Sequence, residues 1–133
     1  MDLSMFHGQK ITMNGTLLGF EALNEFTLIP FEENPIFALL QSDEDNFIGF
    51  IVATPFSIFE TYQFEISEID KERINLENSE DALVLGILTI GDKFENSTMN
   101  LVAPIVVNIK NLKGIQLVLP PTYEYNTKTP ISK

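Results

Sequence analysis

The stretch NSTMNLVAPIVVN, residues 96–108, is apolar over most of its length but carries Pro104 near its centre. Read alternately, the odd-numbered residues from Met99 to Val107 fall on one face, as they do in a β-strand. Proline lacks the N–H that a neighbouring strand needs, so within sheets it is confined to edges and bulges. The stretch therefore predicts an irregular strand with Pro104 at a sheet edge or at a bulge. Asn100 and Asn108, on the face of the proline, are expected to bond turn backbone at the two ends of that strand.

Similar short apolar runs, separated by turn residues, recur along the whole chain and predict an all-β fold. We expect a single-domain β-barrel-like fold of short, mostly antiparallel strands with one or two short helical turns. The domain spans residues 1–121, and residues 122–133, which follow two prolines, form an extended or partly disordered C-terminal tail. The expected strands are residues 10–13, 26–30, 36–41, 47–53, 62–66, 83–90, 99–107 and 114–119.

Three local signals refine this prediction. Residues 36–41 and 47–53 flank a short acidic loop, which favours a hairpin. Residues 111–114 form a second turn, with Gly114 at a position where a positive φ is needed. The one helical segment is residues 67–75, because Ser67 caps its start and Asp70 follows three residues later.

The composition limits the function as well as the fold. The 133 residues include eight basic and nineteen acidic side chains, so the formal net charge is −11. Such a charge repels phosphate backbones and anionic lipids, so we expect no direct contact with nucleic acid or membranes. The acidity serves either solubility or the attraction of a basic protein partner. We expect a cytoplasmic protein, since the N-terminus lacks a signal sequence and no apolar run is long enough to span a membrane.

Residues with catalytic chemistry are scarce. The chain has no cysteine, and His7 is its sole histidine, so thiolate nucleophiles and cysteine-bound zinc are excluded. We therefore expect no catalytic residues, no bound metal, no cofactor and no enzymatic activity. One alternative stays open, a small-ligand-binding or enzymatic β-barrel with a site lined by Tyr62, Asn100 and acidic residues.

Phenylalanine is unusually frequent, with eleven copies in the chain. Phe56 and Phe59 follow Pro55 at the end of an expected strand, where a ring is hard to bury from both sides. Each of these two rings belongs either to the core or to an exposed docking surface.

Several motifs together resemble the bacterial flagellar assembly factor FliW family. The likeness covers nearly the whole chain, and the T-x-N-L-x-A-P-I-V-x-N run of residues 98–108 is its most specific part. The residues that carry the resemblance are Leu40, Gln41, Ser42, Pro55, Tyr62, Thr98, Asn100, Leu101, Pro104, Asn108, Gly114 and Gln116.

The resemblance implies a cytoplasmic, non-enzymatic protein that binds flagellin before export. When free of flagellin, a protein of this family binds the translational repressor CsrA and relieves the repression of flagellin synthesis. We expect a monomer that places negative charge beside the RNA-binding groove of CsrA. The residues expected to meet CsrA are Asp43, Glu44 and Asp45 or, alternatively, Glu68, Asp70 and Glu72. Those expected to meet the amphipathic ends of flagellin are Phe56 and Phe59.

Overall fold

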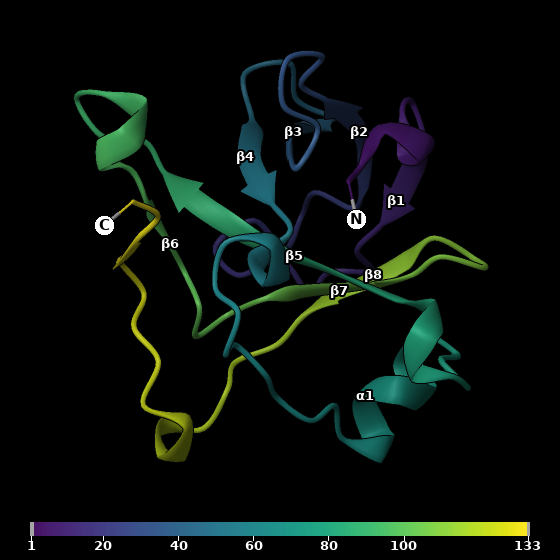
Figure 1. Cartoon of the computed structure of the whole chain (residues 1–133). Helices are drawn as coiled ribbons and strands as arrows, with labels where there is room; N and C mark the ends of the chain where they lie inside the picture. The colour runs from purple at the N-terminus through teal and green to yellow at the C-terminus, as the bar shows by residue number, and fades with distance from the viewer. Residues whose placement is uncertain (1, 133) are drawn as a thin grey trace.

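The structure is a computed structural model that describes residues 2–132 (Figure 1). Met1 and Lys133, which the expected domain and tail include, lie outside the described residues. Seven strands close into a barrel in the order β4, β3, β2, β1, β8, β7 and β5, and β5 returns to pair with β4. The bounds are β1 Lys10–Thr12, β2 Glu25–Pro30, β3 Phe37–Ser42, β4 Gly49–Ala53, β5 Ala82–Thr89, β7 Ile105–Asn108 and β8 Lys113–Gln116.

The barrel confirms the predicted all-β fold of short, mostly antiparallel strands. Neighbouring strands are antiparallel except β1 and β8, which pair in parallel through Thr12 and Lys113. The expected hairpin between residues 36–41 and 47–53 is present as β3 and β4, with Gln41 opposite Gly49. Closing the barrel removes the free edges that an open sheet of these strands would expose.

Alternation along the strands builds two apolar cores. Side chains such as Phe26, Leu28, Leu40 and Leu85 point into the barrel and form the first core. The opposite faces of β5, β7 and β8 form the second core with the segments around them, and its fully buried members include Ile74. Because β7 contributes to both cores, all four of its residues are buried, which explains its apolar sequence on both faces.

The predicted strand of residues 99–107 is interrupted in the middle. Thr98–Met99 form β6, which pairs with one end of β5, whereas Ile105–Asn108 form β7, which pairs with the other end. Residues 100–104 leave the ladder between these two pairings. Pro104 lies in this interruption, just before the interior strand β7, and so not at a sheet edge. Between the two pairings five residues stand against two of β5, so the interruption is longer than the one extra residue of an ordinary β-bulge.

The turn between β7 and β8 differs from the prediction in one respect. The residue with a positive φ is Leu112, at 58°, and not Gly114. Gly114 is needed for a different reason, since a Cβ there would lie 2.8 Å from Met13 Sδ and 3.2 Å from Ile11 Cγ2. The glycine therefore allows close packing against the barrel interior.

The expected strand at residues 62–66 is wrong. This segment is extended, but it pairs with no neighbouring strand. Its backbone is bonded by two tyrosines of the C-terminal segment, since the Tyr125 hydroxyl lies 3.0 Å from Gln63 N and 2.8 Å from Gln63 O, and Tyr123 Oη accepts from Glu65 N at 3.0 Å. Side-chain hydroxyls thus take the place of a partner strand.

The C-terminal segment, expected as a tail over residues 122–133, is described up to residue 132. After a short 3₁₀ helix at Pro121–Tyr123 it runs in an extended conformation alongside the barrel and ends in β9, Thr129–Pro130 (Figure 1). Strand β9 pairs antiparallel with β6, and Tyr123, Tyr125 and Ile131 pack against the second core. The segment is therefore anchored to the barrel at both of its ends.

The expected helix of residues 67–75 is α1, Glu68–Arg73. Ser67 caps it as predicted, because its Oγ accepts a hydrogen bond from Asp70 N and donates one to Asp70 Oδ2. None of the helices between residues 2 and 132 has the length and apolar character that a membrane span requires. The remaining helical turns are 3₁₀ helices at Ser4–Phe6, Pro55–Ser57, Ser79–Asp81 and Phe94–Asn96.

Candidate protein-binding surface

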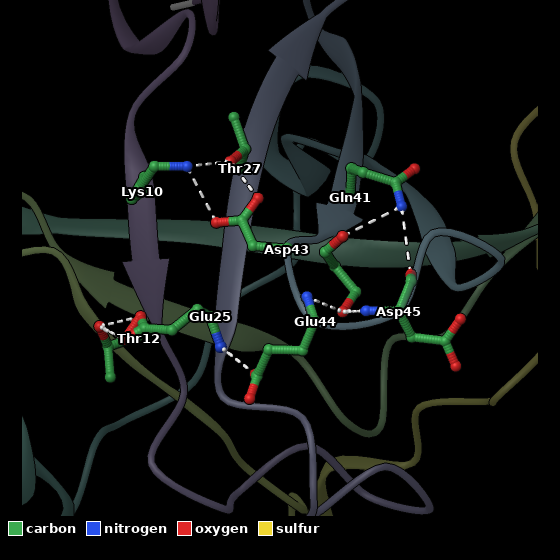
Figure 2. Close-up of polar contacts among 9 residues, drawn as sticks. Lys10, Thr12, Glu25, Thr27, Gln41, Asp43, Glu44 and Asp45 are labelled. Carbon is green, nitrogen blue, oxygen red and sulfur yellow. Dashed lines mark hydrogen bonds and ion pairs between the residues drawn. The ribbon is translucent and has the colours of Figure 1, made fainter.

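Asp43 opens the acidic turn between β3 and β4. Its carboxylate accepts hydrogen bonds from Thr27 Oγ1 at 2.7 Å and from Lys10 Nζ at 3.0 Å (Figure 2). Lys10 also donates to Thr27 Oγ1 at 3.0 Å, so the three side chains form a closed cluster across β1, β2 and the turn. Asp43 is therefore fixed in place by the barrel wall beneath it.

Glu44 folds back toward the start of β2. Its Oε1 accepts from the backbone N–H groups of Asn24 at 2.6 Å and Glu25 at 2.9 Å. Asp45 bonds within the turn, since its Oδ1 accepts from Phe47 N at 2.9 Å. Each of the three carboxylates thus has an intramolecular partner, although Asp43 and Glu44 remain exposed to solvent.

Gln41 and Ser42 organise the same turn from within β3. The Gln41 side chain donates from Nε2 to Ile48 O at 2.9 Å and to Ser42 O at 3.2 Å. The buried Ser42 Oγ accepts from Glu44 N at 3.1 Å and Asp45 N at 3.0 Å. The Leu-Gln-Ser motif that carries part of the family resemblance is therefore a scaffold for the turn.

These bonds also set the ionisation of the turn. The hydrogen bond from Thr27, followed by that from Lys10, lowers the pKa of Asp43. Hydrogen bonds from the backbone N–H groups of Glu25 and Asn24 lower the pKa of Glu44. Both groups are therefore negative at neutral pH and hold their charge in fixed positions.

Phe47 lies at the tip of this turn with 96% of its surface exposed. The sequence prediction placed Phe47 in a strand at residues 47–53, but β4 begins at Gly49. The bond from Phe47 N to Asp45 Oδ1 keeps residue 47 in the turn and directs it away from the sheet. Asp45 was the signal in the sequence that could have placed Phe47 in the turn, because an aspartate side chain often accepts a hydrogen bond from the backbone N–H two residues later.

Phe56 and Phe59 follow β4 at its other end. Phe56 lies in the 3₁₀ helix Pro55–Ser57 and is 50% exposed, whereas Phe59 is half-buried against the second core. Their roles in partner binding stay predictions, and exposure favours Phe56 for that role.

An apolar surface extends from Phe56 to the C-terminal segment. The Phe56 ring lies 5.8 Å from the Tyr62 ring, and Tyr62 lies 4.7 Å from Tyr125 between ring centroids. Tyr125 and the 64% exposed Val118 line a cleft of about 330 Å³ with the prolines that follow β8. Tyr62 itself is buried, so only its neighbours contribute surface. We call Phe56, Tyr125 and Val118 the aromatic patch.

The acidic turn and the aromatic patch do not form one site. The turn precedes β4 and Phe56 follows it, so the two lie at opposite ends of a five-residue strand. Such a strand spans about 16 Å. The acids of α1, the alternative surface, are partly neutralised by their own helix, since Glu68 pairs with Lys71 and Asp70 with Arg73.

The residues expected in a small-ligand site serve the fold. The Tyr62 hydroxyl donates to Leu101 O at 2.8 Å, and burial raises its pKa. Asn100 Oδ1 accepts from Val102 N and Ala103 N in the interruption between β6 and β7. Within residues 2–132, no three histidine or acidic side chains come together as metal ligands would.

Other motif residues stabilise the region around Pro104, which we call the corner. Gln116 donates from Nε2 to Ala103 O at 3.1 Å and accepts from Leu18 N at 2.8 Å. The buried Asn108 donates to Ile74 O and Asn75 O, at 3.0 and 3.1 Å, as well as accepting from the turn after β7. Asn108 thus bonds turn backbone at the end of the stretch, as predicted, whereas Asn100 bonds the backbone of the interruption and not that of a turn at a strand end.

The chain was compared with known families and structures. The FliW protein family model matches residues 3–131. The flagellar assembly factor FliW of Clostridium novyi is 45% identical over 115 residues, which cover 86% of this chain and 80% of the relative. The FliW protein of Bacillus subtilis is 38% identical and covers 95% of this chain and 92% of its own.

A solved structure agrees with these sequence relatives. The crystal structure of a flagellar assembly factor FliW superposes with a TM-score of 0.86 at 31% identity, over 93% of this chain and 86% of the other. On these grounds, the chain belongs to the FliW family of flagellar assembly factors.

Proposed function

We propose that this chain is a cytoplasmic, non-enzymatic and monomeric assembly factor that binds flagellin before export. When free, it binds CsrA and relieves repression of flagellin synthesis. Family membership is the observation that carries the proposal, because the matched residues extend over nearly the whole chain. The two surfaces described above give the two binding events separate places on the barrel.

CsrA binds at the acidic turn in this proposal. A repressor that holds RNA phosphates carries positive charge, and Asp43 and Glu44 offer fixed negative charge that stays ionised at neutral pH. Phe47 adds an exposed ring at the tip of the same turn, and an aromatic ring beside polar groups is typical of an interface hot spot.

The salt dependence of association tests this assignment. Charge steering raises association rates by roughly 10- to 1000-fold and is screened by salt, so the rate of binding to CsrA should fall steeply as salt rises. The triple variant Asp43→Asn, Glu44→Gln and Asp45→Asn should reduce the rate at low salt, because it removes charge but keeps one accepting oxygen on each side chain. At Asp43, whose two oxygens accept from Thr27 and Lys10, one of the two acceptors is lost.

A matched control removes the same charge elsewhere. Glu68→Gln, Glu72→Gln and Glu77→Gln change three exposed acids on and just after α1. The rate should change less in this variant than in the turn variant. A rate that is insensitive to salt contradicts the steering, and a larger effect of the control places CsrA on the helix.

Flagellin binds at the aromatic patch in this proposal. The amphipathic ends of flagellin need an apolar groove to cover their exposed stripe. Tyr125 and Val118 line a cleft of about 330 Å³, and the half-exposed Phe56 adds apolar area beside Tyr62. Phe56→Ala should weaken flagellin binding about 30-fold or more, as a hot-spot ring does.

A stability measurement separates this role from packing. Because Phe56 is half exposed, its removal should cost well under the roughly 3 to 5 kcal/mol of a core phenylalanine. Phe59→Ala is the matched control, since Phe59 packs against the second core and should lower stability more. Unchanged flagellin binding in Phe56→Ala, or unfolding of that variant, would place the groove elsewhere.

The short distance between the two surfaces supports exclusive binding. A standard interface buries about 800 Å² per partner, a patch about 30 Å across. The strand between the acidic turn and Phe56 spans only about 16 Å. Flagellin should therefore displace CsrA from the chain, and a stable ternary complex in size-exclusion chromatography would contradict this part of the proposal.

A further inference from the structure

A third feature shares no residue with either surface and lies beside the loop that joins β2 to β3. It is at the end of β4 from which Phe56 follows, since Phe37 pairs with Ala53. It is an open cleft of about 600 Å³, within the size range of sites that hold small ligands. Three aromatic rings, two carboxylates and one amide line it: Phe31, Phe37, Phe94, Glu32, Glu33 and Asn34.

The rings come from two parts of the chain. Phe31 N donates to Phe37 O at 2.9 Å, which closes the loop and places both rings at its base, with their centroids 6.4 Å apart. Phe94 comes from the 3₁₀ helix between β5 and β6 and meets Phe37 edge to face at 5.0 Å. Phe94 is nevertheless 42% exposed, so part of its surface has no packing partner.

The carboxylates give the cleft its charge. Glu32 and Glu33 are both exposed, and neither takes part in an ion pair within residues 2–132. They differ in this from Asp43, which Lys10 compensates. Uncompensated carboxylates beside ring faces, which are themselves electronegative, favour a cation and disfavour an anion.

We propose that this cleft binds an arginine side chain of a basic protein partner. A guanidinium stacks flat on aromatic rings and pairs with carboxylates through several N–H groups, and the cleft offers both kinds of partner in one place. Its volume leaves room for the peptide backbone on either side of the arginine. The inference goes beyond the proposed function, because it assigns a binding site at residues outside both surfaces and requires neither flagellin nor CsrA.

Peptide titration tests the proposal on the whole chain. The probe is the acetylated and amidated tripeptide Gly-Arg-Gly, added at millimolar concentration while backbone amide resonances are recorded by NMR. Saturable shifts should appear at residues 31–34, 36, 37 and 94. The same peptide with citrulline, which has the shape of arginine without its charge, should bind more weakly.

Two variants sharpen the test. Glu32→Gln with Glu33→Gln, and separately Phe94→Ala, should each weaken arginine-peptide binding roughly 3- to 30-fold, the range expected from ion-pair and cation–π contributions. Glu60→Gln with Glu77→Gln removes equal charge from exposed positions outside the cleft and should leave binding nearly unchanged.

Several results would contradict binding of arginine in this cleft. Equal binding of the arginine and citrulline peptides, shifts at other residues, or no shifts at all would each overturn the proposal. So would undiminished binding in the Glu32→Gln and Glu33→Gln variant, which removes no ring and so remains informative even if Phe94→Ala fails to fold. Loss of flagellin or CsrA binding would bear only on the proposed function.

Discussion

Residues that carry the family resemblance support both the acidic turn, through Gln41 and Ser42, and the corner around Pro104, yet the two regions use polar groups in opposite ways. At the corner, Asn108 is 3% exposed and all its bonds go to protein backbone. At the turn, Asp43 and Glu44 bond the barrel on one side and still meet solvent on the other. If a hydrogen bond of the buried Asn108 is lost, no water can replace its partner. If a bond of Asp43 or Glu44 is lost, water can take the partner's place.

This difference separates a contribution to the fold from a contribution to function. When one partner of a buried hydrogen bond is removed, the polar group left behind stays buried without a partner, and stability falls by the full cost of desolvating that group. Losing an exposed charge costs little stability and changes mainly what the surface attracts. Four predictions test the distinction, from the largest expected effect to the smallest.

The largest effect is expected at Asn108. Asn108→Ala leaves Asn75 O and Lys110 N without their side-chain partner and opens a small cavity, so the free energy of unfolding should fall by about 3 kcal/mol. Chemical denaturation measures the loss. Asn111→Ala is the control, because Asn111 also donates to Ile74 O but is exposed and should cost about 1 kcal/mol. Equal losses would mean that burial does not set the cost at this corner.

A smaller loss is expected at Tyr62. Tyr62→Phe keeps the ring against its aromatic neighbours but removes the 2.8 Å bond to Leu101 O, which should cost about 1 to 2 kcal/mol. Tyr123→Phe removes a bond to a more exposed backbone group and should cost less. Thermal unfolding of both variants gives the comparison, and a larger loss at Tyr123 would contradict it.

At Phe47 the stability effect should nearly vanish. Because the ring is 96% exposed, Phe47→Ala should change the free energy of unfolding by less than about 0.5 kcal/mol. If the turn binds CsrA as proposed, affinity should still fall about 30-fold or more, as it does at an interface hot spot. Calorimetric titration with CsrA, beside a melting curve, distinguishes a docking ring from an inert one.

The smallest effect is expected in the pH dependence of stability. The folded-state pKa values of Asp43 and Glu44 are lowered, so their contribution is present above the unfolded pKa values and is lost as pH falls through the folded ones. Asp43→Asn with Glu44→Gln should therefore slightly reduce the loss of stability between neutral and strongly acidic pH. Melting curves at several pH values check this, and an increased acid sensitivity of the variant would contradict it.

The sequence allowed accurate prediction where the decisive signals are local. Periodicity identified the strands, the acidic loop located the first hairpin, and Ser67 marked the start of α1. Prediction was wrong at residues 62–66, where an apolar, aromatic run has strand character but Tyr123 and Tyr125 supply the partners. It also missed Phe47, because the bond to Asp45 that holds residue 47 in the turn competes with strand propensity.

By itself, the sequence determined the all-β class, the acidity and the irregularity at Pro104, because alternation, net charge and a missing N–H are properties of the chain. Only the tertiary structure decided how that irregularity is used. A Cβ on Gly86 would collide with Met99 Sδ, so the close approach of β5 and β6 beside the interruption depends on contacts between segments distant in sequence. The same holds for the cleft at Phe31, Phe37 and Phe94, because the Phe94 ring meets Phe37 only when the segments that carry them come together in the barrel.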